Sequence, residues 1–212
     1  MPAIELRRRL TWPKSWPKIW NVLDDWKSPS WNDQTRAVVA ERLEHVPERR
    51  FFNAAEWAIL QAAVDRLLPQ PDRPEPIPVA AFIDDKLARD IGDGYRYAGM
   101  PHQRDAWRLG LAAIEAEAQA RFHRGFAELE PGFRDMLLKA IQHGEALAEW
   151  PLPPRRFFMD LLLKTAVTFY YAHPDAWTEI GFGGPASPRG YVRLGLDRRD
   201  GWEPPRMPWP PR

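Results

Sequence analysis

A dense apolar helix that stops abruptly places the strongest constraint on how this chain folds. Residues 157–173 (FFMDLLLKTAVTFYYAH) are mostly aromatic or aliphatic, which predicts a buried helix. Pro174 ends it, because proline lacks an amide hydrogen and its ring clashes with the preceding turn. Residues 177–191 (WTEIGFGGPASPRGY) then combine glycines and prolines, which disfavour regular structure, with large apolar side chains that favour burial. This irregular tail must therefore pack on a surface, either the chain's own or a partner's.

Tryptophans are also concentrated near the N-terminus. Residues 1–31 interleave tryptophan with proline and lysine, and the prolines argue against a long helix. We expect an extended arm with one turn near residues 19–26. Exposed tryptophans would form a large apolar surface, so the arm should dock. The tryptophans of this arm are Trp12, Trp16, Trp20, Trp26 and Trp31.

Helical periodicity dominates the rest of the chain. It predicts helices at residues 33–45, 53–68, 78–91, 101–122, 131–144 and 154–173. No segment shows a convincing alternating strand pattern. The predicted fold is therefore all-α, a bundle of about six helices with an irregular N-terminal arm and a Gly/Pro-rich C-terminal tail. The predicted division is an arm at 1–31, a helical bundle domain at 32–174 and a partner-wrapping tail at 175–212.

Several local signals refine these helices. Asn53 followed by Glu56 forms a capping-box pattern at the start of the second helix. The apolar spacing places Val38, Val39 and Leu43 inward on the first helix, Ile91 on the stripe of the third, and Phe133 on that of the fifth.

Composition excludes several classes of protein. The chain has 30 basic and 29 acidic residues, and its net charge of +1 provides no field that would steer a nucleic acid. It has no cysteine, which excludes disulfides and thiolate zinc sites. No apolar window is long enough for a transmembrane helix. Arg7–Arg9 are not followed by the apolar region of a signal peptide, so we expect a cytoplasmic location.

No catalytic motif stands out. The segment 181–185 (GFGGP) lacks the preceding strand and following helix of a phosphate loop. The five histidines show no metal-ligand spacing, and His173 is expected to cap a carbonyl at the end of the last helix. Asp84 and Asp85 point in different directions on a helix, as do Glu115 and Glu117, so neither pair forms a carboxylate dyad. We expect no catalytic, cofactor or metal site in this chain.

Several of these stretches resemble the gluconate 2-dehydrogenase subunit 3 family. The resemblance rests on residues 51–60 (FFNAAEWAIL) with 67–69 (LLP), and on 82–84 (FID), Tyr95, 169–174 (FYYAHP) and 180–185 (IGFGGP). It extends over residues 50–203, and the tail from Trp177 to Tyr191 is its most specific part.

The resemblance implies a function. Members of the family are small, non-catalytic subunits of sugar and polyol dehydrogenases. Their large partner is a flavoprotein of the glucose-methanol-choline type that holds FAD, and a cytochrome c often accepts the electrons. In several complexes the small subunit carries a twin-arginine signal, which this sequence lacks. A periplasmic location then requires export through another subunit.

We therefore expect a chaperone-like small (gamma) subunit that binds, stabilises and helps to mature such a flavoprotein. FAD is expected in the partner, with no nucleic acid bound and no direct membrane insertion. Gly183 and Gly184 would allow close backbone approach, and Arg189 and Arg193 would pair with carboxylates. The expected interface comprises Trp12, Trp16, Trp20, Trp26, Trp31, Trp177, Ile180, Phe182, Gly183, Gly184, Pro185, Arg189, Tyr191, Arg193 and Trp202.

Three alternatives stay open. Both extensions could fold back on their own bundle and leave the chain monomeric. The chain could be a stand-alone small-molecule-binding protein or enzyme, with an aromatic pocket between helices that includes His173 or His143. Arg7–Arg9 and the nearby tryptophans could form a nucleic-acid-binding arm, which would show salt-dependent retention of DNA or RNA.

Overall fold

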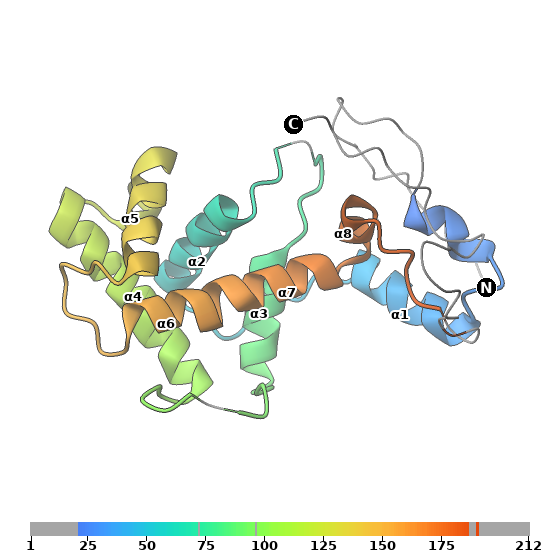
Figure 1. Cartoon of the computed structure of the whole chain (residues 1–212), viewed down its shortest axis with the longest axis horizontal. Helices are drawn as coiled ribbons and strands as arrows, with labels where there is room; N and C mark the ends of the chain where they lie inside the picture. Colours follow the sequence, from blue (N-terminus) through green and yellow to red (C-terminus); the bar gives the residue numbers. More distant parts are fainter. Residues whose placement is uncertain (1–20, 72, 96, 187–189, 191–212) are drawn as a thin grey trace, which may run out of the picture. The chain divides into compact units, whose positions relative to one another are not determined.

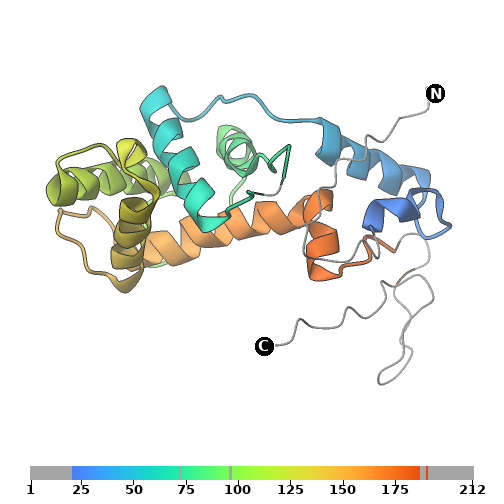
Figure 2. The ribbon, with the colours of Figure 1, turned by 90° about the horizontal axis from the view of Figure 1, so that it is seen from above.

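The computed structural model describes residues 21–71, 73–95, 97–186 and 190, and within these ranges it contains helices and no strand. The all-α prediction is confirmed. The chain divides into two compact units (Figures 1 and 2). Unit 1 takes its described residues from Met1–His45, Pro71–Ile77 and Tyr171–Arg212, and unit 2 consists of Val46–Gln70 and Pro78–Tyr170. The described ends of the predicted arm and tail thus join the first helix in one unit.

Unit 2 is a helical bundle. It contains α2 (Ala54–Leu67), α3 (Val79–Ala88), α4 (Gln103–Phe122), η2 (Phe126–Glu128), α5 (Pro131–His143), α6 (Pro154–Arg156), η3 (Phe157–Leu163) and most of α7 (Lys164–Ala172). Helix α2 packs against α3, α4 and α5, and α5 also contacts α6 and η3 (Figure 1). The core of unit 2 therefore lies among α2, α4, α5 and η3.

The helix ends of unit 2 follow local capping rules. Asn53 accepts a hydrogen bond from the Glu56 amide, and the Glu56 side chain accepts one from the Asn53 amide, so the predicted capping box is confirmed. Pro131 is the first residue of α5, where its missing N–H is not needed. Gly144 ends α5 in the left-handed conformation, with φ of 78°.

Helices α6 and α7 are joined by a π-helical stretch, η3, so that residues 154–172 are helical without interruption. The ring of Phe157 in η3 lies against α4 at Gly110, where a Cβ would stand 2.1 Å from the Phe157 Cε2 atom. Phe157 also meets Trp107 edge-on at 5.9 Å, and Trp107 meets Phe52 at 6.2 Å between ring centroids. Gly110 therefore permits the close approach of α4 and η3.

Asp84 on α3 is a buried carboxylate with a structural role. Its oxygens accept hydrogen bonds from the amides of Arg50 (2.6 Å), Phe51 (3.1 Å) and Phe52 (2.8 Å). The neighbouring Asp85 instead forms ion pairs with Arg50 and Arg89. The two carboxylates act separately, as their positions on the helix predict.

Unit 1 is built from short elements at distant places in the sequence. They are η1 (Val22–Lys27), α1 (Asp33–Glu44), α8 (Pro174–Trp177) and η4 (Thr178–Ile180). Asn32 caps α1 by accepting from the Thr35 amide. Helix α8 contacts both α1 and η1, so the start of the described chain packs on residues near its end.

Three predicted inward side chains are exposed. Val38 lies on the outer face of α1, because α1 buries only a narrow stripe at Val39. Ile91 lies beyond the end of α3, where Asp90 adopts positive φ and breaks the helical stripe. Phe133 sits in the first turn of α5, and Leu137, Leu138 and Ile141 supply the buried face of that helix instead.

Candidate functional site

The predicted interface residues fall into two groups. The described ones are Trp26, Trp31, Trp177, Ile180, Phe182, Gly183, Gly184 and Pro185. The others lie outside the described residues, and they are Trp12, Trp16, Trp20, Arg189, Tyr191, Arg193 and Trp202.

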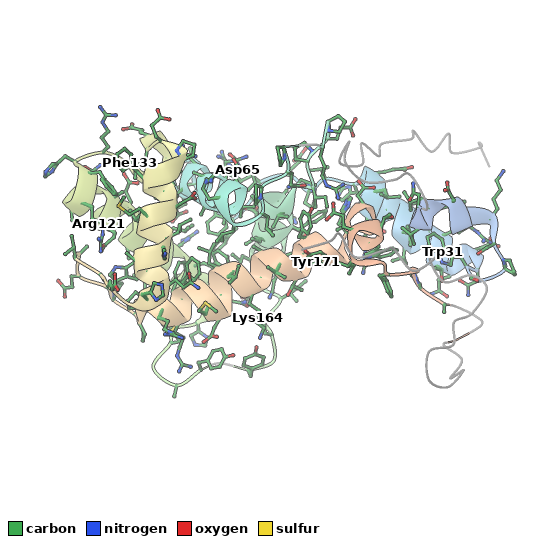
Figure 3. The ribbon with its side chains drawn as sticks, turned by 45° about the horizontal axis from the view of Figure 1, so that its top comes forward. Trp31, Asp65, Arg121, Phe133, Lys164 and Tyr171 are labelled. Atoms are coloured by element: carbon green, nitrogen blue, oxygen red, sulfur yellow. The ribbon has the colours of Figure 1, made fainter. Side chains whose placement is uncertain are left out.

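A tryptophan cluster forms the core of unit 1. Its buried members are Val22, Trp31, Val39 and Trp177, and the half-buried Leu23, Trp26, Leu43 and Phe182 pack against them. Trp26 meets Trp31 edge-on with 5.7 Å between ring centroids, and Trp177 meets Phe182 at 5.4 Å. Figure 3 shows Trp31 beside α1. The described ends of the predicted arm and tail thus bury their rings against each other.

Gly184 makes the closest contact in this cluster. It adopts φ of +79°, and a Cβ built on it would stand 2.7 Å from Trp31 Cζ2 and 3.0 Å from Val22 Cγ2. Both the backbone conformation and the space therefore require glycine. Within this chain the residue that Gly184 approaches is Trp31, and its predicted close approach to a partner stays a prediction.

Hydrogen bonds link the same segments. The Val22 amide donates to Thr178 Oγ1 at 3.2 Å, and the Phe182 amide donates to the Trp177 carbonyl at 2.9 Å. The Trp177 indole N–H donates to the Tyr171 carbonyl at 3.0 Å. These bonds hold residues 171–182, which include the short helices α8 and η4, in a defined conformation.

Ile180 differs from its neighbours because its side chain is 55% exposed. It ends η4, and Gly181 follows it in the left-handed conformation, with φ of +68°. By contrast, Trp31 and Trp177 are buried within unit 1. Ile180 is thus the predicted anchor that this segment presents to solvent, while the two tryptophans hold the segment in place. Their role toward a partner stays a prediction.

His173 caps a different helix from the one predicted. Its Nδ1 atom accepts a hydrogen bond from the Asp175 amide at 3.3 Å, so it caps the start of α8 and not the end of α7. Burial lowers the pKa of His173, against the raising effect of the Asp175 carboxylate and of a hydrogen bond with the Arg42 backbone. Arg73 donates to the Asp175 carbonyl at 3.0 Å and pairs with Glu179. The prediction failed because Pro174 starts a new helical turn, which His173 can cap.

Unit 2 contains a cleft of about 450 Å³ between the loop 90–101, the start of α4 and η3. Arg104 and Arg108 place their guanidinium carbons 5.0 and 4.6 Å from the centroid of the Phe51 ring. The π-helical stretch contributes Asp160 and Leu161 to the same wall. His102 lines this cleft, whereas His143 and His173 are not among its described lining residues.

Two tyrosines are among the residues that line the cleft. Tyr95 and Tyr97 meet edge-on at 5.4 Å, and the Lys164 ammonium contacts the Tyr95 hydroxyl. This contact lowers the pKa of Tyr95, whereas a hydrogen bond to Tyr95 raises the pKa of Tyr97. The Arg156 guanidinium lies over the Tyr97 ring at 4.8 Å. Aromatic and polar side chains line the cleft, and they include both acidic and basic groups.

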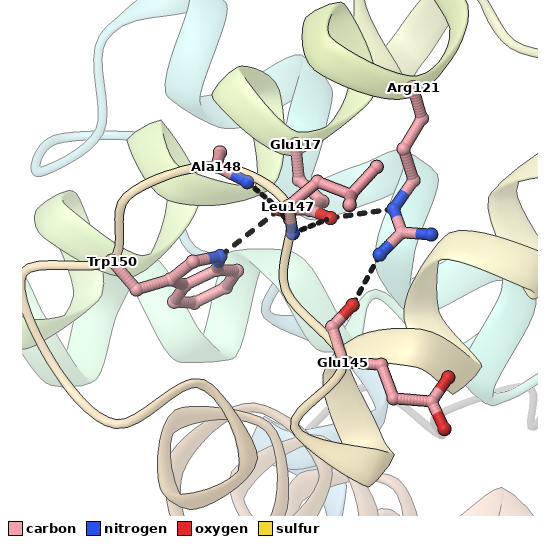
Figure 4. Close-up of polar contacts among 6 residues, drawn as sticks. All are labelled: Glu117, Arg121, Glu145, Leu147, Ala148 and Trp150. Atoms are coloured by element: carbon pink, nitrogen blue, oxygen red, sulfur yellow. Dashed lines mark hydrogen bonds and ion pairs between the residues drawn. The ribbon is translucent and has the colours of Figure 1, made fainter.

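Glu117 on α4 is a second buried carboxylate with a structural role (Figure 4). It accepts hydrogen bonds from the amides of Leu147 (2.8 Å) and Ala148 (2.9 Å), from the Trp150 indole N–H (3.4 Å) and from Arg121 Nε (2.6 Å). Burial raises the pKa of this carboxyl, but the four donors outweigh burial and hold the pKa below its ordinary value. Glu117 thereby fixes the loop 145–150 on the end of α4.

Sequence reasoning missed this role of Glu117. Its hydrogen-bond partners lie about thirty residues along the chain, and no local spacing marks them. The one available signal was a carboxylate on the apolar stripe of α4, beside Ala113, Ile114 and Ala118. A charge in such a place requires dedicated donors.

Nowhere in the described ranges do three or more His, Asp or Glu side chains gather in a way that could hold a metal ion. Within the same part of the chain, no helix has both the length and the apolar character needed to cross a membrane.

A family model for gluconate 2-dehydrogenase subunit 3 matches residues 54–184, which is more than half of the 212-residue chain. The chain belongs to the gluconate 2-dehydrogenase subunit 3 family. No curated protein and no solved structure matches it. The family is named for a subunit of an oxidoreductase complex, which implies partner subunits.

The family match covers the described helices of unit 2 and ends at Gly184. It includes Trp177 and Gly184 but begins after Val22, Trp31 and Val39. The end of the matched region, which contains Trp177 and Gly184, is therefore packed against residues that precede the match.

Proposed function

We propose that this protein is the non-catalytic small subunit of an FAD-dependent dehydrogenase of sugars, polyols or alcohols. It binds, stabilises and helps to mature the flavoprotein large subunit, which has the glucose-methanol-choline type and holds FAD. A cytochrome c accepts the electrons. The family match over residues 54–184 is the observation that carries this proposal.

Segments that are already ordered in this chain support the proposed binding role. Buried carboxylates and tight glycine contacts hold irregular segments of both units in fixed conformations, as at Glu117 and Gly184. A segment that is ordered before binding loses little conformational entropy when a partner docks. Unit 1 presents Ile180 on such a segment, and we propose it as one anchor for the flavoprotein.

Stabilisation of the partner follows from mass action. A subunit that binds the folded flavoprotein and not its unfolded chain shifts the folding equilibrium by RT ln(1 + [L]/Kd), which is about 2.7 kcal/mol at a hundredfold excess over Kd. A marginally stable flavoprotein would therefore fold, and keep FAD, better in the presence of this subunit.

Co-expression tests this function. The tagged chain should copurify with a flavoprotein that shows the absorbance of bound FAD and is identified by mass spectrometry. The same flavoprotein expressed alone should be insoluble or poor in FAD. Full solubility, FAD content and activity of the flavoprotein without this chain would contradict the proposal.

The cleft of unit 2 favours a second candidate, a small-molecule-binding protein. Its volume of about 450 Å³ and its Tyr95–Tyr97 wall suit a ligand of modest size. In that case the purified chain should retain a ligand or turn over a substrate without any flavoprotein. Native mass spectrometry of the purified chain distinguishes this candidate from the first.

A further inference from the structure

The cleft of unit 2 offers a ligand one exposed aromatic ring, that of Tyr95. This residue is 53% exposed, although Tyr97 packs edge-on against it with 5.4 Å between ring centroids. The ring of Phe51 also lines the cleft, but it is buried, and the guanidinium groups of Arg104 and Arg108 lie over it. An apolar face of a ligand therefore finds its packing surface on Tyr95.

Local contacts hold this ring in place. The Lys164 ammonium, at the start of α7, donates to the Tyr95 hydroxyl and lies 5.0 Å from the centroid of the ring (Figure 3). Two residues before Tyr95, the Asp93 carboxylate accepts a hydrogen bond of 3.0 Å from the Gln103 side chain of α4. A side chain that is ordered in this way loses little conformational entropy when a ligand packs on it.

A π-helical segment forms another part of the cleft. Asp160 and Leu161 line the cleft, and both belong to η3. The π-helix is rare in proteins and occurs frequently at functional sites. The cleft thus combines an exposed ring with a π-helical segment, and this combination favours a binding site over an incidental hollow.

Opposite charges balance around the cleft. Among its lining residues, Asp90, Asp105 and Arg104 form no ion pair with any described residue, and His102 is neutral at pH 7. The charged side chains that line the cleft, or that form an ion pair or ring contact with a lining residue, are Glu56, Asp90, Asp93, Asp105 and Asp160 on the acidic side and Lys86, Arg104, Arg108, Arg156 and Lys164 on the basic side. A charged ligand therefore finds no excess of the opposite sign to compensate for its lost hydration.

The polar groups of the cleft specify what an uncharged ligand must carry. A carboxylate such as that of Asp105 accepts hydrogen bonds, whereas the guanidinium of Arg104 only donates them. A hydroxyl group serves both, because it donates one hydrogen bond and accepts others. A sugar carries several hydroxyl groups and also has an apolar C–H face that packs on an aromatic ring. The cleft volume of about 450 Å³ lies within the range of small-molecule sites.

We infer that this cleft binds an uncharged monosaccharide or disaccharide, with a C–H face of the sugar on the Tyr95 ring and its hydroxyl groups on Asp105 and Arg104. This inference gives a ligand class to the second candidate function, the small-molecule-binding protein, and it rests on that candidate. The flavoprotein has no part in the binding.

Titrations of the purified chain test the inference. Saturation-transfer NMR measures binding of D-glucose, of maltose, and of two analogues that differ from glucose chiefly in charge, D-glucuronate and protonated D-glucosamine. The cleft variants are Tyr95→Ala and Arg104→Ala. Matched controls outside the described lining of the cleft are Phe133→Ala, an exposed ring of α5, and Arg155→Ala, an exposed cation of α6. Circular dichroism must show that each variant folds.

Glucose or maltose should bind saturably to wild type, and both charged analogues should bind at least tenfold more weakly. Each folded cleft variant should lose at least tenfold in affinity, while the two controls bind as wild type does. Binding of neither sugar, equal binding of the charged analogues, or full binding by the folded cleft variants would overturn the inference.

Native mass spectrometry separates this failure from failure of the candidate function. A chain that binds no sugar but retains another ligand would keep the second candidate function without the inference. A chain that retains no ligand would contradict both. Copurification with a flavoprotein is a separate measurement, and the first proposal depends on that measurement alone.

Discussion

Gly184 lies against the indole of Trp31, and a Cβ at Gly184 would approach Trp31 Cζ2 to 2.7 Å. The two residues are far apart in the sequence, and the φ of +79° at Gly184 is one that other residues rarely adopt. This contact ties the glycine-rich tail to the tryptophan cluster of unit 1.

Gly184→Ala should therefore destabilise unit 1. The positive φ alone costs about 1–2 kcal/mol for a residue with a Cβ, and the clash with Trp31 and Val22 adds to it. Near-UV circular dichroism and tryptophan fluorescence during urea unfolding measure the effect. Gly181→Ala is the matched control, because it also has positive φ but no atom within 4 Å of the added Cβ. Equal losses in the two variants would show that the Trp31 contact adds nothing.

Gly110→Ala should disrupt unit 2. The added Cβ would stand 2.1–2.4 Å from three atoms of the Phe157 ring, so α4 and η3 would have to separate. Overpacking of this kind costs about 1–3 kcal/mol, and more where the backbone cannot shift. Chemical unfolding of the variant checks this. Gly132→Ala in the first turn of α5 meets no neighbouring atom and should leave stability unchanged or raise it slightly.

Glu117→Gln should cost about 2–3 kcal/mol, because an amide cannot satisfy all four donors that the buried carboxylate serves. Glu149→Gln in the same loop is exposed and should have little effect. Hydrogen exchange of the Leu147 and Ala148 amides should accelerate in the first variant alone. Unchanged exchange of these amides would contradict the assigned role.

Acid should weaken the same network. The pKa of Glu117 is lowered by folding, so its stabilising contribution is complete above the unfolded value near 4.3 and is lost as the pH falls. The unfolding free energy of wild type should therefore fall more steeply below about pH 4.3 than that of Glu117→Gln. An unfolding free energy that changes with pH equally in wild type and in Glu117→Gln would contradict the lowered pKa of Glu117.

His173 should make unit 1 sensitive to mild acid. Burial lowers its pKa in the folded state, so near the ordinary value of 6.5 the unfolded chain binds the proton more readily. The unfolding free energy is then highest above pH 6.5 and falls as the pH decreases through that value. His173→Asn retains a side-chain acceptor for the Asp175 amide and should remove this dependence between pH 5 and 7. Urea unfolding monitored by tryptophan fluorescence over that range measures it.

Local sequence rules predicted where the helices begin and end better than they predicted which distant residues contact them. The Asn53–Glu56 capping box, Pro131 and Gly144 mark helix ends, because each acts on atoms within a few residues. The burial of Trp31 by Gly184 and the hydrogen bonds of Glu117 depend on residues 30 to about 150 positions away. No periodicity in a single sequence encodes such distances.

The sequence also predicted poorly which way individual side chains point. Val38 and Phe133 fit an apolar stripe, but their helices bury only part of it. His173 was expected to cap the helix before it and caps the one after it, because Pro174 permits a fresh turn. Seven of the predicted interface residues lie outside the described residues, and their assignments stay predictions: Trp12, Trp16, Trp20, Arg189, Tyr191, Arg193 and Trp202.

The tryptophan cluster also determines when unit 1 can fold. Val22, Trp31 and Val39 gain their neighbours Trp177 and Gly184 only after about 150 more residues have been synthesised. Native pairings across such a sequence separation form slowly. During translation Trp26 and Trp31 therefore emerge from the ribosome before Trp177 and Gly184 have been made. Over this interval they are open to chaperones, or to a partner chain synthesised nearby.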